Sequence, residues 1–296
     1  MNKKVYVKIG ISLIFIIGII SIRIYSLKEI NKSNIDVSKY IQYMDDISTS
    51  KVQVNWKYVA SIIGSKYNNK FKDINESEIK KIGNEFIREE NGTYSLFSFN
   101  EVLDKLDLRK SQKKRAVNYL KDLENYGLKP SSLKPDGKYM RFINDIKAAA
   151  ISNYKNYKIL PSITIAQAIL ESNWGESKLS ADYNNLFGIK ANPSWKGESI
   201  LIDTKEYYNQ SIKDKFRVYK TKDESLIDHA KFLSENKRYK NVFEKKTYIE
   251  QAEELQKAGY STVMDKEGNY TYKKLLVQII QQYNLQLIDS NINESK

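Results

Sequence analysis

Apolar residues recur every three to four positions along most of the chain after residue 54, and this spacing predicts a mostly α-helical protein. The pattern is interrupted at residues 129–137, KPSSLKPDG, which contain two of the four prolines and a turn-forming Pro-Asp-Gly. This interruption predicts a domain boundary. We therefore expect a small helical domain over residues 55–130 and a second domain over residues 138–288, with the tail from Asp289 frayed.

The second domain is predicted to contain helices and one β-hairpin. A helical pattern over about residues 140–154 is followed by an apolar helix that begins near Pro161. Two later stretches, 199–208 and 212–219, alternate between apolar and polar residues and are separated by Asn209-Gln210-Ser211. Such alternation is typical of strands, so a β-hairpin is predicted here within an otherwise helical domain.

The first 26 residues have a different pattern. A cluster of lysines precedes an apolar stretch from Ile9 to Ile22, and Val5 to Tyr25 reaches the ~20 residues that a membrane-spanning helix needs. Because the lysines lie on the N-terminal side, we expect a single-pass anchor at residues 1–26 with a cytoplasmic N-terminus. The alternative is a signal peptide, although no small-residue cleavage site follows. The polar residues 27–54 are expected to form a stalk with some helix near Val37 to Ile47.

Composition narrows the functional classes. The net charge of +13 favours polyanionic partners, but lysine is spread along the chain without a nucleic-acid-binding motif, so nucleic acid is not expected. The absence of Cys excludes a thiolate nucleophile, and the single histidine, His229, excludes a multi-His metal site. His229 is expected to be structural, and no metal or cofactor is predicted.

Glu171 is the main candidate for chemistry. It ends the apolar helix after Ala168-Ile169-Leu170, and Trp174 follows within a turn. Most glutamates at helix ends are ordinary surface residues, but an apolar setting opposes ionisation of the carboxyl and raises its pKa. A carboxyl group of that kind can act as a general acid near neutral pH, as cleavage of a glycosidic bond requires.

Glycoside hydrolysis usually needs a second carboxylate across the sugar from the acid. The predicted hairpin supplies Glu206, with Asp203 as the fallback and Glu198 at its start. Alternation places Glu206 on the same face of the strand as Thr204. The sequence leaves open whether the fold brings Glu206 and Glu171 together.

The motif residues resemble those of a known enzyme family. Ala168-Ile169-Leu170-Glu171-Ser172-x-x-Gly175, Asn185-Leu186-Phe187-Gly188-Ile189-Lys190 and Tyr270-Thr271-Tyr272-Lys273-Lys274-Leu275 are similar to the signature of glycoside hydrolase family 73. These are bacterial endo-β-N-acetylglucosaminidases. The resemblance covers residues 140–285 and implies a lysozyme-like helical domain with a small β-hairpin lobe around a groove.

The resemblance also implies roles for individual residues. Glu171 would be the general acid and Glu206 the second carboxylate, unless the substrate's own N-acetyl group assists and Glu171 alone suffices. Tyr270 would lie near the active site, and Tyr207 would flank Glu206. The loop that carries Asn185 and Phe187 would bind an N-acetyl sugar. The segment before Tyr270 is longer than is usual in the family.

The expected function is hydrolysis of the β-1,4 bond between N-acetylglucosamine and N-acetylmuramic acid in peptidoglycan. A lytic transglycosylase, a muramidase and an inactive wall-binding scaffold are the alternatives. The predicted anchor places the catalytic domain outside the cell membrane, facing the wall. The first domain is expected to act as a spacer or as a module that binds the wall or a membrane-protein partner.

Overall fold

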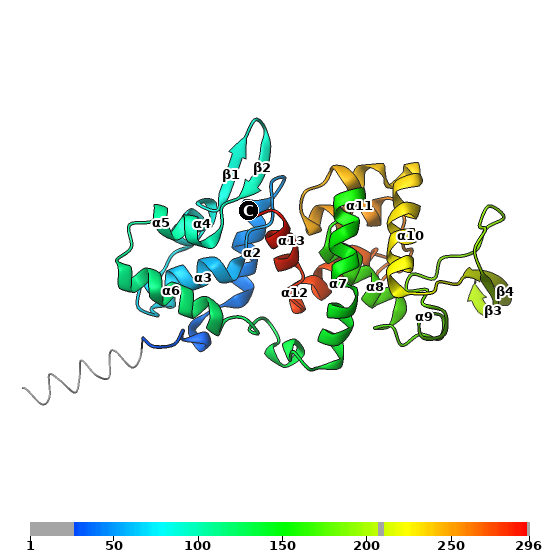
Figure 1. Cartoon of the computed structure of the whole chain (residues 1–296), viewed down its shortest axis with the longest axis horizontal. Helices are drawn as coiled ribbons and strands as arrows, with labels where there is room; N and C mark the ends of the chain where they lie inside the picture. The colour runs from blue at the N-terminus through cyan, green and yellow to red at the C-terminus, as the bar shows by residue number, and fades with distance from the viewer. Residues whose placement is uncertain (1–26, 207–209, 295–296) are drawn as a thin grey trace, which may run out of the picture.

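The computed structural model describes residues 27–206 and 210–294, which form a mostly helical protein with two short antiparallel hairpins (Figure 1). Helices from the first half of the chain lie at one end, and those from the second half lie at the other. The C-terminal helices lie between the two groups (Figure 1). The predicted helical class is therefore confirmed.

The first half surrounds its own apolar core. Its elements are α2 (Val37–Ser48), α3 (Trp56–Lys66), α4 (Glu76–Asn84), β1 (Ile87–Glu90), β2 (Thr93–Leu96), α5 (Phe99–Lys105) and α6 (Lys110–Asp122). The β1–β2 hairpin was not predicted, although its turn is Asn91-Gly92 with positive φ at both residues, as two-residue hairpin turns favour.

The helix expected near Val37 to Ile47 is present as α2, but the segment 27–54 that contains it does not form a stalk. Ile30, Tyr40, Met44 and Val54 are buried in the same core as α3 and α6. Asp36 caps α2 by accepting a hydrogen bond from the backbone of Lys39. The apolar face of α2 is interspersed with polar residues, and it becomes part of the core only because α3 and α4 cover it.

The second half is built around one buried helix. The α-helices and strands are α7 (Lys138–Tyr157), α8 (Pro161–Ser172), α9 (Lys178–Tyr183), β3 (Ser199–Glu206), β4 (Gln210–Arg217), α10 (Lys222–Glu235), α11 (Tyr248–Lys257), α12 (Tyr272–Gln282) and α13 (Gln286–Ile292), and the 3₁₀ helix η4 (Lys237–Glu244) follows α10. Ten of the twelve residues of α8 are buried, because α7, α11, α12 and α13 pack around it. Pro161 begins the helix, as predicted.

The predicted hairpin is also present. β3 and β4 pair antiparallel, with Ser199 opposite Arg217 and Glu206 opposite Gln210. The hairpin projects away from the helices (Figure 1). The division of the chain at residues 130–138 remains a prediction, although the two groups of buried apolar residues lie on either side of it except for Leu133, which belongs to the second group.

The two halves are joined by buried polar contacts. The Trp56 indole nitrogen donates to Asn284 Oδ1 at 3.2 Å, and the Tyr248 hydroxyl donates to Asp45 at 2.6 Å. The expected fraying from Asp289 is wrong, because that residue is fully buried in α13 and accepts hydrogen bonds from Ser162. Asn284, which lies just before α13, therefore connects the C-terminal segment to the first half.

The predicted single-pass membrane localisation is corrected by the structure. Within residues 27–206 and 210–294, no helix is both long and apolar enough to cross a membrane. The longest, α7, has 20 residues but carries charges along its length, and the apolar α8 has only 12, fewer than the ~20 that are needed. The segment from Val5 to Tyr25, on which the prediction rested, lies outside the described residues.

Candidate active site

A sharp backbone turn ends α8 directly after Glu171. Asn173, Trp174 and Gly175 all have positive φ, between 50° and 77°. A side chain at Gly175 would meet the Phe142 ring at 2.8 Å, so only glycine fits there. The turn directs the Trp174 ring against Tyr139 and Tyr283, at 4.4 Å and 4.8 Å between ring centroids. Trp174 therefore anchors the end of α8.

The aromatic partner of Glu171 is Tyr272, the first residue of α12. The Tyr272 hydroxyl donates to Glu171 Oε1 at 2.8 Å, and it accepts from Gln167 Nε2 at 3.0 Å. Gln167 lies one turn before Glu171 on α8, and it is fully buried. Gln167 and Tyr272 together fix the position of the Glu171 carboxyl.

Burial beside protein atoms raises the pKa of Glu171, and the hydrogen bond from Tyr272 opposes this effect in part. The Glu171 side chain is nevertheless exposed to solvent. A raised pKa and an exposed side chain are both expected for a carboxyl that lines an open cleft. A substrate can reach such a carboxyl, but the surrounding protein atoms limit its hydration. Glu171 thus has the setting that a general acid requires.

Glu171 lines a cleft of about 470 Å³. Its walls are largely aromatic and apolar, with Phe187, Ile189, Phe232, Tyr239 and Tyr260 among the lining residues. Flat apolar walls with hydroxyl groups suit the faces and edges of sugar rings. A short polar edge of Lys190, Asn192 and Arg217 leads away from Glu171 toward the β3–β4 hairpin.

His229 packs behind the aromatic residues of the cleft, where it contacts Phe187 and Tyr260. It is fully buried, its ring stacks on Phe187 at 3.7 Å, and its Nε2 is 3.1 Å from the Tyr260 hydroxyl. The Tyr260 ring stacks in turn on Tyr272 at 5.2 Å. The expected structural role of His229 is therefore confirmed, and two of the rings that it contacts line the cleft.

Replacing His229 with Phe should make folding stability less sensitive to acid. Burial lowers the pKa of His229 to about 3, whereas an unfolded histidine titrates near ~6.5. As the pH falls below ~6.5, the unfolded chain therefore takes up a proton that the folded chain does not, and stability decreases. Relative to the parent, His229→Phe should gain about 2 kcal/mol between about pH 7.5 and about pH 5.

Denaturant titrations of both proteins at the two pH values provide the measurement. The lost hydrogen bond to Tyr260 lowers the stability of the variant at both pH values, so only the change in the difference is informative. A difference between variant and parent that stays constant with pH would contradict a neutral buried His229.

The predicted substrate-binding residues differ in whether they line the cleft. Phe187 lines the cleft. Asn185 does not: it is 1% exposed, and its amide bonds the backbone of Ile189 and Arg217. It holds the loop in place. Tyr270 is 52% exposed and is also absent from the cleft lining, so the structure does not place it beside Glu171.

The hairpin residues are less fully described. Glu206 ends β3, where its backbone pairs with Gln210, but its side chain lies outside what the structure describes. Tyr207 also lies outside the described residues. The role of Glu206 as the second carboxylate therefore stays a prediction.

Sequence reasoning missed the contact between Tyr272 and Glu171. The available signal was the Tyr270-Thr271-Tyr272 repeat, in which either tyrosine could begin the following helix. Tyr272 is 2% exposed and begins α12, while Tyr270 pairs with Met264 in an isolated bridge on the loop before it. Tyr272, rather than Tyr270, is therefore the tyrosine that contacts Glu171.

Comparison with known proteins identifies the domain around this cleft. Residues 147–285 match the Glucosaminidase family, described as mannosyl-glycoprotein endo-β-N-acetylglucosaminidase. The chain is 41% identical over 156 residues to the exo-glucosaminidase LytG of Bacillus subtilis, covering 50% of this chain and 52% of LytG. It is 40% identical over 127 residues to the peptidoglycan hydrolase FlgJ of Salmonella typhimurium, covering 40% of this chain and 38% of FlgJ.

Among solved structures, the catalytic domain of the autolysin Auto from Listeria monocytogenes is 36% identical, with a TM-score of 0.46. The match covers 53% of this chain and 90% of the Auto domain. This chain spans about half of LytG and less of FlgJ. Residues 147–285 therefore form a glucosaminidase domain of glycoside hydrolase family 73.

Proposed function

We propose that this protein is a peptidoglycan hydrolase that cleaves the β-1,4 bond between N-acetylglucosamine and N-acetylmuramic acid. The observation that carries the proposal is Glu171, whose pKa is raised and which lies in an aromatic cleft of the glucosaminidase domain. The names of LytG and FlgJ, a glucosaminidase and a peptidoglycan hydrolase, support the substrate class.

Glu171 is the proton donor in this mechanism. Its carboxyl proton moves to the glycosidic oxygen while the bond from that oxygen to the sugar C1 breaks, so the leaving sugar departs as a neutral alcohol. The carboxylate that remains accepts a hydrogen bond from Tyr272, which Gln167 holds in place. Glu171 regains a proton before the next turnover: from solvent if Glu206 takes the proton of the attacking water, or from that water itself if the acetamido group acts at C1.

Either of two groups can complete the reaction at C1. We propose Glu206 as the base that activates water, with the acetamido group of the substrate as the alternative nucleophile. Asp203 is the other candidate on the hairpin; it is exposed on β3, opposite Lys213. Because Asp203 lies on the same strand as Glu206, it serves as the comparison residue.

Glu206→Gln should lower the hydrolysis rate by ~10²-fold or more if Glu206 is the base, because the amide cannot accept a proton from water. Asp203→Asn makes the matched change three residues earlier in the chain and should leave the rate close to that of the parent. Steady-state cleavage of purified wall measures both. An active Glu206→Gln variant would assign the step to the acetamido group, and a loss confined to Asp203→Asn would move the base role there.

Mass analysis of the products tests the bond that is cleaved. Purified peptidoglycan digested by this protein should yield fragments with reducing N-acetylglucosamine ends. Reducing N-acetylmuramic acid ends would indicate a muramidase, and anhydro ends a lytic transglycosylase. We further propose endo cleavage, which releases long glycan fragments early in the digest. Release of only single terminal sugars would indicate exo cleavage, the activity in the name of LytG.

A further inference from the structure

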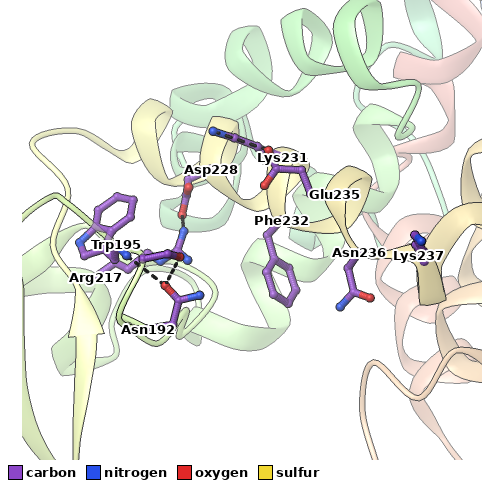
Figure 2. A pocket seen from close by; sticks show the side chains of 10 residues that line it. Asn192, Trp195, Arg217, Asp228, Lys231, Phe232, Glu235, Asn236 and Lys237 are labelled. Carbon is purple, nitrogen blue, oxygen red and sulfur yellow. Dashed lines mark hydrogen bonds and ion pairs between the residues drawn. The ribbon is translucent and has the colours of Figure 1, made fainter.

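A second cavity continues the groove beyond the Glu171 cleft. It has a volume of about 550 Å³ and is lined by residues from the loop before β3, from β4, from α10 and from η4 (Figure 2). Asn192, Arg217 and Phe232 line both cavities. The two cavities are therefore neighbouring parts of one groove, and a ligand in the Glu171 cleft can extend into the second cavity.

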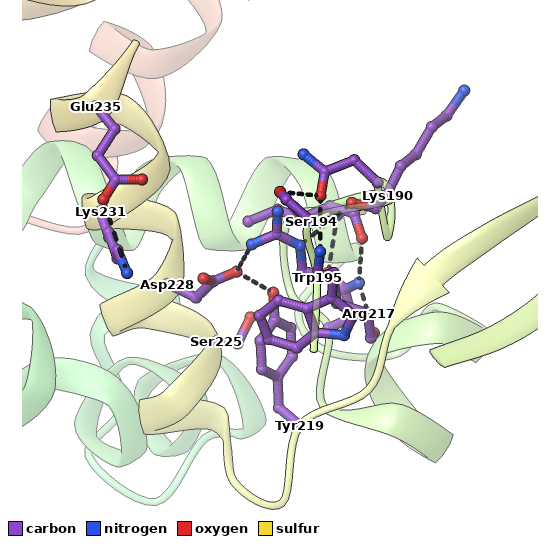
Figure 3. Close-up of polar contacts among 12 residues, drawn as sticks. Lys190, Ser194, Trp195, Arg217, Tyr219, Ser225, Asp228, Lys231 and Glu235 are labelled. Carbon is purple, nitrogen blue, oxygen red and sulfur yellow. Dashed lines mark hydrogen bonds and ion pairs between the residues drawn. The ribbon is translucent and has the colours of Figure 1, made fainter. Parts of the chain in front are cut away.

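In the wall of the second cavity nearest the hairpin, the charged side chains are held by mutual contacts and their charges cancel. The Arg217 guanidinium bonds Asp228 at 2.6 Å and lies over the Trp195 ring, 4.4 Å from its centroid (Figure 3). The Tyr219 hydroxyl donates to the same Asp228 oxygen at 2.6 Å. Because Arg217 and Asp228 neutralise one another, this wall provides shape but little net charge.

The part of the lining that follows Asp228 along α10 and into η4 has an excess of positive charge, with two lysines and one glutamate. Lys231 is 3.7 Å from Glu235, and both side chains are more than half exposed, so this ion pair is weak. Lys237 begins η4 and is exposed, and among the described residues its ammonium has no ion-pair partner. Lys237 is thus available to bind an anionic group that enters the cavity (Figure 2).

Two amide side chains add hydrogen-bond donors. The Oδ1 atom of Asn192 accepts from the backbone of Trp195, and that of Asn236 accepts from the backbone of Arg238. Within the described part of the chain, neither NH₂ group has an acceptor. The cavity therefore adds the Lys237 ammonium and the Asn236 amide, which do not line the Glu171 cleft, to the Asn192 amide that lines both.

We propose that this second cavity binds the stem peptide of peptidoglycan, with a peptide carboxylate at Lys237 and peptide carbonyls at Asn192 and Asn236. The inference rests on the proposed function and adds a specificity site to it. A peptide attached to a muramic acid next to the cleaved bond carries the carboxylates and carbonyls that these donors match. The faces of the sugar rings carry no charge, so the rings alone would leave the Lys237 ammonium without a partner; removal of the peptide by an amidase leaves one lactyl carboxylate on the muramic acid, close to the ring.

The test compares two soluble substrates: glycan fragments that carry stem peptides, and the same fragments after an amidase has removed them. Lys237→Ala should raise KM for the peptide-bearing glycan by about tenfold, because one charge-assisted hydrogen bond is lost. It should leave kcat for that substrate and KM for the bare glycan unchanged. Lys240→Ala is the matched control, since Lys240 is exposed on the same helix but does not line the cavity.

Each outcome is decisive. An equal rise in KM for both substrates would assign the cavity to the glycan itself and overturn the proposal. An unchanged KM for both, or the same rise with Lys240→Ala, would also overturn it. If the parent protein cleaves neither substrate, the proposed function fails; if it cleaves both and only the Lys237 effect is missing, the peptide site alone fails.

Discussion

Glu171→Gln is expected to reduce glycan cleavage by ~10²–10⁴-fold, the typical contribution of general acid–base catalysis. Glutamine keeps the size of the side chain, and its carbonyl oxygen can still accept the hydrogen bond from Tyr272. The amide cannot donate a proton to the glycosidic oxygen, so the leaving sugar would have to depart as an alkoxide. The fold should be retained, because the Glu171 side chain is exposed at the cleft.

The release of reducing ends from purified peptidoglycan provides the measurement. Glu176→Gln is a matched control, because Glu176 is an exposed glutamate just beyond the end of α8 and pairs with Lys138 at 2.9 Å. It should retain the activity of the parent. Turnover like that of the parent in Glu171→Gln would refute the assignment of the acid, and equal inactivity of both variants would indicate a structural effect instead.

Trp56→Ala is expected to destabilise both halves of the protein by about 3–5 kcal/mol, as large aromatic-to-alanine changes in a core typically do. Trp56 is 1% exposed in the core of the first half, yet its indole donates to Asn284 at the end of α12. Asn284 in turn donates to the backbone carbonyl of Tyr126. Removal of the indole leaves a cavity and an unpaired buried amide oxygen at the junction of the two halves.

Urea unfolding monitored by circular dichroism and by loss of wall cleavage tests this expectation. Both signals should report one transition, and Trp56→Ala should move it to lower urea. Tyr270→Ala is the control, because Tyr270 is an aromatic residue that is 52% exposed and lines neither cavity of the groove. A cleavage transition that does not move would mean that residues 138–296 fold independently of the first half.

Local sequence was sufficient for the elements that carry the chemistry. The apolar run after Pro161 predicts the buried helix α8 and places Glu171 at its end, because helical periodicity and the proline at its start are local properties. Alternation predicts β3 and β4 with boundaries within two residues. The motif around Glu171 identifies the family, since its residues are close together in the sequence.

Tertiary packing decided what local pattern could not. Tyr270 and Tyr272 are equivalent by sequence, and only the docking of α12 against α8 brings the Tyr272 hydroxyl to Glu171. Residues 27–54 are polar enough to resemble a stalk, but α3 and α4 bury one face of α2. The buried pair of Trp56 and Asn284 joins positions at opposite ends of the sequence. Contacts of this kind depend on how whole helices pack against one another. The amino-acid pattern of one segment therefore does not predict which distant segment it will contact.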